Sequence, residues 1–196
     1  MKAPHYPKLF VISAPSGTGK STLCTRLLKE VPNLVLSIST TTRKPRGQEK
    51  HGVEYFFVST DEFKKMISEK KFAEWAEVHG NYYGTSHAVL RDSMAAGKSV
   101  LLDIDVQGAE QLRQAYPDDC YSIFITPPSL EVLLERLKGR GTDSDESIQK
   151  RMKNAKDEMK EIPKFHQTVV NDQLESAFQE LKKSVEKMVK TQKVGS

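Results

Sequence analysis

The most constraining feature of the sequence is a glycine-rich stretch that joins two segments of different hydrophobic period. Leu9–Ser13 is short, apolar and rich in residues that favour strands, which is typical of a buried strand. From Lys20 to Val31, apolar residues recur at steps of three and four, which predicts a helix. The residues that join these two segments are Ala14-Pro15-Ser16-Gly17-Thr18-Gly19-Lys20-Ser21.

This stretch follows the P-loop pattern, with Ala14 in place of the first glycine. A loop whose N–H groups converge at a helix N-terminus binds anions, because the helix dipole is positive there. Gly17 and Gly19 permit the unusual dihedrals and the close approach that such a loop needs. Lys20 offers a cation to the β- and γ-phosphates, and Ser21 offers a hydroxyl to Mg²⁺. The alternative interpretation is a flexible turn with a surface lysine.

The rest of the chain alternates between short apolar segments and longer segments with helical spacing. Strands are expected at about 34–38, 55–58, 74–78, 99–104, 122–125 and 169–170. Helices are expected after Ser59 and at about 89–96, 129–138, 144–161 and 174–189. This alternation predicts an α/β fold with a parallel sheet and helices on both faces. The stretch from about 38 to 88 breaks the rhythm and is interpreted as an insertion, in which Trp75 is expected to be core.

Length, charge and cysteine usage exclude several classes of protein. The 196 residues predict one domain at about 150 residues per domain. Thirty basic residues against 26 acidic ones are too balanced for a typical nucleic-acid binder. No apolar run approaches the roughly 18 residues of a membrane span, and the N-terminus has no signal-peptide core. Two cysteines, Cys24 and Cys120, make no disulfide framework, so we expect buried thiols and a cytoplasmic protein.

Two carboxylates lie at the end of the strand predicted at about 99–104. Asp103 lies near the end of the apolar segment 99–104, and Asp105 comes two residues later. Ligands of parallel α/β sheets bind at the carboxyl ends of the strands, so both side chains are expected near the glycine-rich loop. A carboxylate there is a candidate partner for the metal of a bound nucleotide. The alternative is two ordinary acids in a polar turn.

Two sets of arginines are candidates for phosphate binding. Arg43 and Arg46 flank Pro45, and Gly47 follows, so they do not lie on a solvated helix face and could converge on one phosphate. Arg136 and Arg140 lie four residues apart near a helix end. An enzyme that moves a phosphoryl group between two nucleotides needs both sets, one for the acceptor and one for the transferred group. For each set, ordinary surface charge is the alternative.

Taken together and in order, these motifs resemble the guanylate kinase family. The resemblance runs from about residue 8 to 190, and the segments that carry it beyond the glycine-rich loop are Thr41-Thr42-Arg43-Lys44-Pro45-Arg46, Gly52-Val53-Glu54-Tyr55, Glu74-Trp75, Asn81-Tyr82-Tyr83-Gly84, Asp103-Ile104-Asp105-Val106-Gln107-Gly108, Arg136 to Thr142, and Val170-Asn171-Asp172. It implies a three-layer P-loop core at about 8–37, 89–129 and 161–190. A GMP-binding region at about 38–88 and a helical lid at about 130–160 complete the implied domain.

The resemblance also implies the reaction and its residues. The family transfers the γ-phosphoryl group of ATP to GMP, giving GDP and ADP, with Mg²⁺, in purine nucleotide metabolism and GMP recycling. The implied ATP site is Ala14, Pro15, Ser16, Gly17, Thr18, Gly19, Lys20, Ser21, Thr22 and Asn171. The implied GMP site is Arg43, Arg46, Tyr55 and Tyr83 for the phosphate, with Ser39, Glu74, Thr85 and Asp105 for guanine. The implied catalytic residues are Lys20, Arg136, Arg140 and Arg151, and the implied metal site is Ser21 and Asp103.

Two alternatives to this enzyme stay open at the level of sequence. A non-catalytic guanylate-kinase-like interaction module keeps the fold but loses the ATP loop, whereas Gly17, Gly19, Lys20 and Ser21 are all present here. Another small-molecule P-loop kinase would lack the segments around Glu74 and the following tyrosines. The sequence leaves open whether the chain is a monomer or a homo-oligomer, and whether deoxy-GMP is an equal substrate.

Overall fold

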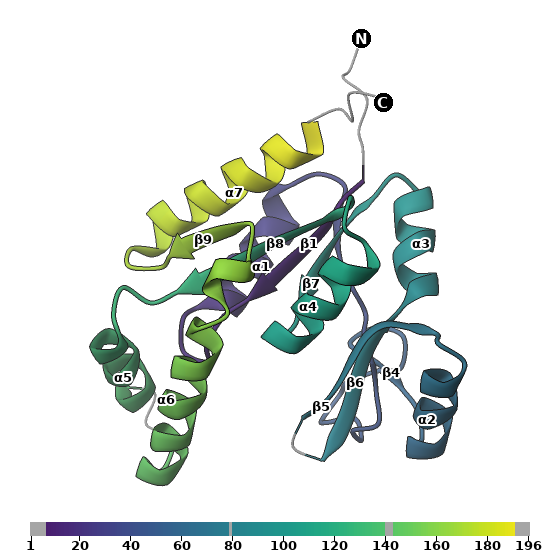
Figure 1. Ribbon diagram of the computed structural model, residues 1–196, viewed down its shortest axis with the longest axis horizontal. Coiled ribbons are helices and arrows are strands. Elements are labelled where there is room, and N and C mark those ends of the chain that lie inside the picture. The colour runs from purple at the N-terminus through teal and green to yellow at the C-terminus, as the bar shows by residue number, and fades with distance from the viewer. Residues whose placement is uncertain (1–6, 79, 140–142, 191–196) are drawn as a thin grey trace.

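A parallel sheet organises the chain, as the alternation of strands and helices predicts. The computed structural model describes residues 7–78, 80–139 and 143–190. Its larger sheet has five parallel strands in the order β2-β7-β1-β8-β9 (Figure 1). Their bounds are β1 Leu9–Ser13, β2 Leu34–Leu36, β7 Ser99–Asp103, β8 Cys120–Thr126 and β9 Gln167–Val170. The central position of β1 places the glycine-rich loop at the middle of the sheet's carboxyl edge.

Helices cover both faces of this sheet, so its central strands are apolar on both sides. The covering helices are α1 Lys20–Glu30, α3 His87–Ala95, α4 Val106–Ala115 and α7 Leu174–Lys190. Phe10 and Ile12 of β1 join the cluster that α1 and α7 contribute, whereas Leu9 and Val11 join the cluster of α3 and α4. Each fully buried apolar side chain contributes about 1.5–3 kcal/mol. Within the described ranges, no helix is both long and apolar enough to cross a membrane.

The insertion folds into a second, smaller sheet. Its strand order is β4-β3-β6-β5, with bounds β3 Thr40–Thr41, β4 Phe56–Phe57, β5 Phe72–Val78 and β6 Asn81–Ser86. Helix α2 (Thr60–Ser68) begins where the Ser59 hydroxyl accepts a hydrogen bond from the Glu62 N–H at 3.1 Å. Phe63 of α2 is fully buried and stacks on Phe72 and Tyr82.

The expectation that Trp75 is core is wrong. Trp75 is 36% exposed, because it lies on the edge strand β5, where its ring contacts Tyr82 of the aromatic stack. The cysteine expectation is confirmed for burial, since Cys24 and Cys120 are 4% and 5% exposed and neither is in a disulfide.

Two further helices lie between β8 and β9 in the chain. Helices α5 (Leu130–Gly139) and α6 (Asp145–Met159) pack on each other through a small buried cluster of Leu133, Leu137, Ile148 and Ala155. A short 3-10 helix, Ile162–Lys164, returns the chain to β9. The break predicted at Gly139-Arg140-Gly141 falls largely on residues 140–142, which lie outside the described ranges. Figure 1 shows the α5–α6 pair at the lower left and the smaller sheet at the lower right, both below the larger sheet.

Candidate functional site

The glycine-rich loop forms a cavity at the N-terminus of α1. Gly17 and Gly19 have φ of 100° and 87°, a region that non-glycine residues rarely adopt. The loop is braced internally, because the buried Thr18 hydroxyl donates to the Pro15 carbonyl at 2.8 Å. A cavity of about 440 Å³ follows the loop, and its lining is Ala14, Pro15, Ser16, Gly17, Thr18, Gly19, Lys20, Ser21, Thr22, Asp103 and Glu158.

A cation and a carboxylate meet inside this cavity. Lys20, from the first turn of α1, forms an ion pair with Asp103 at the end of β7. Ser21 is exposed beside them and lines the same cavity. The described residues hold no group of three or more histidine, cysteine or acidic side chains that could bind a metal unaided. A divalent cation here would therefore take most of its oxygen ligands from phosphate and water, which is how Mg²⁺ usually binds.

Asn171, which follows β9, supports the loop from behind. Its side-chain amide is 5% exposed and donates to the Thr18 carbonyl at 2.6 Å. A Cβ on Gly19 would lie 2.6 Å from the same nitrogen, so Gly19 is required for this contact. Arg136 of α5 donates to the Asn171 carbonyl at 2.9 Å and thereby connects α5 to this support.

Of the other two candidate arginines of the α5–α6 region, one reaches the loop. Arg151 of α6 donates to the Ser16 hydroxyl at 2.8 Å, and its second terminal nitrogen lies 3.0 Å from Asp143. The Asp143 carboxylate is largely buried, so it fixes the guanidinium at the mouth of the cavity. Arg140 lies outside the described residues.

A second, smaller cavity lies between the insertion and the carboxyl edge of the larger sheet. Its volume is about 210 Å³, and its lining is Ser39, Tyr55, Glu74, Ala76, Val78, Tyr83, Asp103, Ile104 and Asp105. Five of the eight residues predicted for GMP line it. The other three, Arg43, Arg46 and Thr85, do not, although Thr85 lies opposite Glu74 in the β5–β6 register. Asp103 lines both this cavity and the cavity of the loop.

Glu74 is the buried acid of the second cavity. It is 5% exposed, and burial raises its pKa to about 7, partly opposed by Thr85 and reinforced by the negative charge of Asp105. The Thr85 hydroxyl is also fully buried, and it lies close enough to the Glu74 carboxylate to lower its pKa. A Cβ on Gly108 would lie 2.7 Å from Glu74 Oε2, so the start of α4 approaches the carboxylate closely. The smaller cavity therefore places a buried acid and a buried hydroxyl side by side.

The two arginines of the insertion differ in their surroundings. Arg43 is 9% exposed, donates to Glu49 Oε1 at 3.0 Å, and lies over the Tyr55 ring at 5.2 Å from its centroid. The Glu49 hydrogen bond raises the pKa of Arg43 above its usual value. Arg46 is exposed, and its backbone N–H donates to Glu49 Oε2 at 2.7 Å. The Glu49 carboxylate therefore accepts hydrogen bonds from the Arg43 side chain and from the Arg46 backbone.

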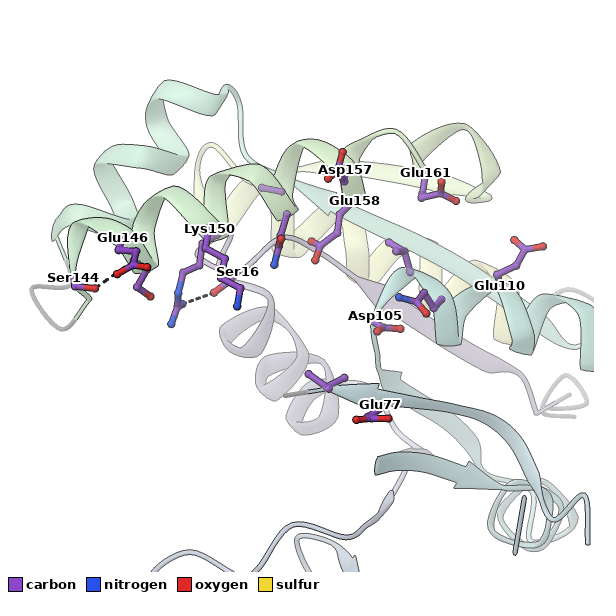
Figure 2. A pocket seen from close by; sticks show the side chains of 17 residues that line it. Ser16, Glu77, Asp105, Glu110, Ser144, Glu146, Lys150, Asp157, Glu158 and Glu161 are labelled. Atoms are coloured by element: carbon purple, nitrogen blue, oxygen red, sulfur yellow. Dashed lines mark hydrogen bonds between the residues drawn. The ribbon is translucent and has the colours of Figure 1, made fainter. Parts of the chain in front are cut away.

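A wide cleft of about 1280 Å³ lies between α6 on one side and α4 and β5 on the other. Figure 2 shows Glu158 directed from α6 into this cleft, with Asp105 and Glu77 on the opposite side. Glu158 also lines the cavity of the loop. Burial raises its pKa to about 7, Lys20 opposes this, and Asp105 adds to it.

Glu158 is not among the residues predicted from the sequence, although one signal points to it. Arg151, Ala155 and Glu158 lie at positions i, i+4 and i+7 of α6, which places them on one helix face. Ala155 is buried, and Arg151 reaches the loop, so this face is turned toward the core. The resemblance implies Asn171 only as a residue of the ATP site, whereas its hydrogen bond to the loop joins residues 153 positions apart, which no local pattern reveals.

Comparisons with known proteins agree on one family. The family model described as guanylate kinase matches residues 6–188. The chain is 51% identical over 174 residues to the guanylate kinase of Dechloromonas aromatica, covering 89% of this chain and 86% of that protein. It is 52% identical over 174 residues to that of Geobacter sulfurreducens, covering 89% and 85%. A crystal structure of guanylate kinase from Anaplasma phagocytophilum matches with a TM-score of 0.76 and 32% identity, covering 96% and 89%.

Proposed function

The chain belongs to the guanylate kinase family, which phosphorylates GMP to GDP with ATP, and we propose that it performs this reaction between its two cavities. The cavity of loop 14–22 holds the phosphates of ATP, and the cavity around Glu74 holds GMP. The observation that carries this arrangement is Asp103, which lines both cavities. Donor and acceptor phosphates bound there lie next to each other, as phosphoryl transfer requires.

Charge and position supply the catalysis. A phosphate oxygen of GMP forms the new bond to the γ-phosphorus as the bond to the ADP oxygen breaks. Lys20, which lines the cavity, and Arg151, which donates to Ser16 at its mouth, are the proposed cations for the transferred group. Both are already held, by Asp103 and by Asp143, so little reorganisation is needed when charge develops. Arg136 and Arg140 complete the proposed set from the lid, which we assign to about 130–160.

The residues present fit a magnesium ion bound with ATP. Ser21 supplies a hydroxyl and Asp103 a carboxylate in the cavity that takes the phosphates. When bound, Mg²⁺ would neutralise charge on the β- and γ-phosphates. Asp103 also pairs with Lys20, which keeps the lysine directed along the cavity rather than into solvent.

Glu74 is the proposed guanine-reading residue of the insertion, at about 38–88. Guanine presents N1–H and the exocyclic amino group side by side, and a carboxylate accepts both. The site suits this contact, since the Glu74 carboxylate and the Thr85 hydroxyl are both buried and lie beside each other. Adenine has an acceptor at N1, so against AMP the Glu74 oxygens would be left unpaired in a closed site. Ser39 and Asp105 line the same cavity, and Arg43, Arg46, Tyr55 and Tyr83 are proposed to hold the phosphate of GMP.

The test compares acceptors on wild type and Glu74→Gln by coupled ADP release. Wild type should strongly prefer GMP over AMP. Replacing one acceptor oxygen by a donor should lower kcat/KM for GMP by roughly 10- to 150-fold, the worth of a charged hydrogen bond. AMP should change little, so the GMP-to-AMP ratio falls. Glu62→Gln in α2 of the same insertion is the control, because Glu62 is exposed and lines neither cavity nor the wide cleft. An unchanged ratio in Glu74→Gln rejects Glu74 as the guanine reader.

We also propose that the reaction takes place in the cytoplasm. Both cysteines are buried as free thiols, and burial raises the pKa of Cys24 to about 12 and that of Cys120 to about 11. Thiols of this kind are unreactive and suit a reducing compartment. Fractionation of cells that express the protein would check the location.

A further inference from the structure

At the junction between α4 and β5, one side chain forms the backbone hydrogen bonds that a neighbouring strand would otherwise form. β5 is an edge strand, so its residues that face away from β6 have free backbone groups. Trp75 is such a residue. The Gln111 side chain of α4 accepts from the Trp75 N–H at 3.0 Å and donates to the Trp75 carbonyl at 2.9 Å. One amide therefore satisfies both backbone groups of the residue that follows Glu74.

The same helix meets the Glu74 side chain one turn earlier. Gly108 leaves room for the carboxylate, since a Cβ there would lie 2.7 Å from Oε2. Asp105 caps α4 by accepting from the Gly108 N–H at 2.8 Å, and its charge raises the pKa of Glu74. Positions 105, 108 and 111 are spaced by three residues, so one face of α4 contacts both the backbone and the carboxylate of this part of β5.

Helix α4 is fixed to the core, whereas β5 belongs to the insertion. Ala109 and Leu112 of α4 are fully buried against the larger sheet. On its other side, β5 pairs with β6 of its own sheet. Contacts with α4 therefore determine where Glu74 stands relative to Asp105 across the smaller cavity.

We infer that Gln111 is a positioning residue for guanine selectivity, because it fixes the backbone at Trp75 and thereby the Glu74 carboxylate. The inference rests on the proposed role of Glu74. Gln111 does not line the smaller cavity, so it acts through β5 rather than on the nucleotide. Its two hydrogen bonds are accessible to water, so their loss should shift the carboxylate without unfolding the chain.

The experiment compares GMP with IMP, which keeps N1–H but lacks the exocyclic amino group. Gln111→Leu keeps a similar size and loses both hydrogen bonds. It should raise KM for GMP and lower the GMP-to-IMP ratio of kcat/KM by about two- to tenfold, the usual worth of one or two hydrogen bonds. KM for ATP and kcat at saturation should stay at wild-type values. Gln111→Glu keeps an acceptor for the Trp75 N–H, so its GMP-to-IMP ratio should lie between those of wild type and Gln111→Leu.

A matched control lies on the same helix. Gln114 donates to Glu110 at 2.8 Å on an exposed part of α4, and within the described residues it makes no hydrogen bond to Trp75 or Glu74. Gln114→Leu removes an amide of equal size and should leave the GMP-to-IMP ratio unchanged. A ratio that falls equally in both variants would reject a specific role for Gln111.

A double-mutant cycle with Glu74→Gln separates this inference from the proposed function. If Gln111 acts through Glu74, Gln111→Leu should lower the ratio no further once Glu74 is changed. If Glu74→Gln alone leaves the ratio unchanged, the role of Glu74 fails. If Glu74→Gln lowers it and Gln111→Leu does not, Gln111 is a structural residue only and the inference is overturned, whatever the thermal midpoint does.

Discussion

At the scale of single residues, the buried acid Glu74 changes the stability of the folded chain by an amount that depends on pH. Burial raises its pKa in the folded chain from about 4.5 to about 7. The folded state therefore holds a proton between these values that the unfolded state has released. Stability from this group is present below about pH 4.5 and is lost as the pH rises toward 7, so above pH 7 the carboxylate is a destabilising charge.

We therefore expect Glu74→Gln to gain stability relative to wild type as the pH rises, with a clearly larger difference at pH 8 than at pH 5. Urea unfolding at both pH values, without nucleotide, measures the difference. Glu77→Gln on the same strand is exposed and should differ from wild type equally at both pH values. A Glu74→Gln difference that does not change with pH would mean that the acid is ionised throughout this range.

Lys20 is expected to matter for activity more than for stability, because its side chain serves the ligand rather than the fold. It is partly exposed and pairs with Asp103, which is also partly exposed. Lys20→Ala should lower kcat by about 10²-fold or more, since a cation directed at developing charge is lost. The thermal midpoint should barely move. Lys29→Ala, in the last turn of α1, is the control and should keep full ADP release.

At the scale of elements, the turn from β1 into α1 depends on the left-handed conformation of Gly19. Its φ of 87° costs an alanine about 1–2 kcal/mol. The new Cβ would also meet Asn171 at 2.6 Å and displace the amide that supports Thr18. We expect Gly19→Ala to weaken ATP binding strongly in calorimetry while GMP binding survives.

Gly97 provides the matched control for this prediction. It ends α3 with φ of 72°, and a Cβ there would meet nothing within 4 Å. Gly97→Ala should therefore lose similar stability through the backbone alone and bind ATP normally. Equal loss of ATP binding in both variants would attribute the Gly19→Ala effect to general destabilisation.

The elements with strong hydrophobic periods could be predicted, and those without could not. β1, α1, β7 and α7 match their expected ranges closely, because long apolar runs or helical spacing mark them. No helix is predicted at α4, whose buried side includes Gly108 and Ala109, and β3 is only two residues long. Trp75 was expected in the core because it is large and apolar, but its place on an edge strand is a property of the sheet order.

The residues of the candidate site also divide into those that the sequence predicts and those that it does not. Motif spacing identifies the loop and Asp103, because their geometry is local to β1, α1 and β7. Motif resemblance identifies Glu74, whose burial comes from α4. The contacts of Asn171 with Thr18, and of Gln111 with Trp75, join distant segments through single side chains. Such contacts depend on packing and leave no period in the sequence.

At the scale of the whole molecule, catalysis needs parts that stand apart in the free chain. The cleft of about 1280 Å³ separates α6 from α4 and β5, and Figure 2 shows side chains of both sides facing it. Water in a cleft of this size would compete with GMP for the γ-phosphate. Closing the cleft when both nucleotides are bound would exclude that water and confine transfer to GMP.

We therefore expect GMP and a non-hydrolysable ATP analogue together to reduce the radius of gyration in small-angle scattering. A compact chain of this length has a radius of about 16 Å, so the change is read against the nucleotide-free protein at equal concentration. Each nucleotide alone should give less compaction than both. Arg151→Met removes the link from α6 to Ser16 and should weaken the response, whereas Arg91→Met on α3, outside the cleft, should keep it. An unchanged radius with both nucleotides bound would show that the cleft stays open during the reaction, and water would then have to be excluded by the ligands themselves.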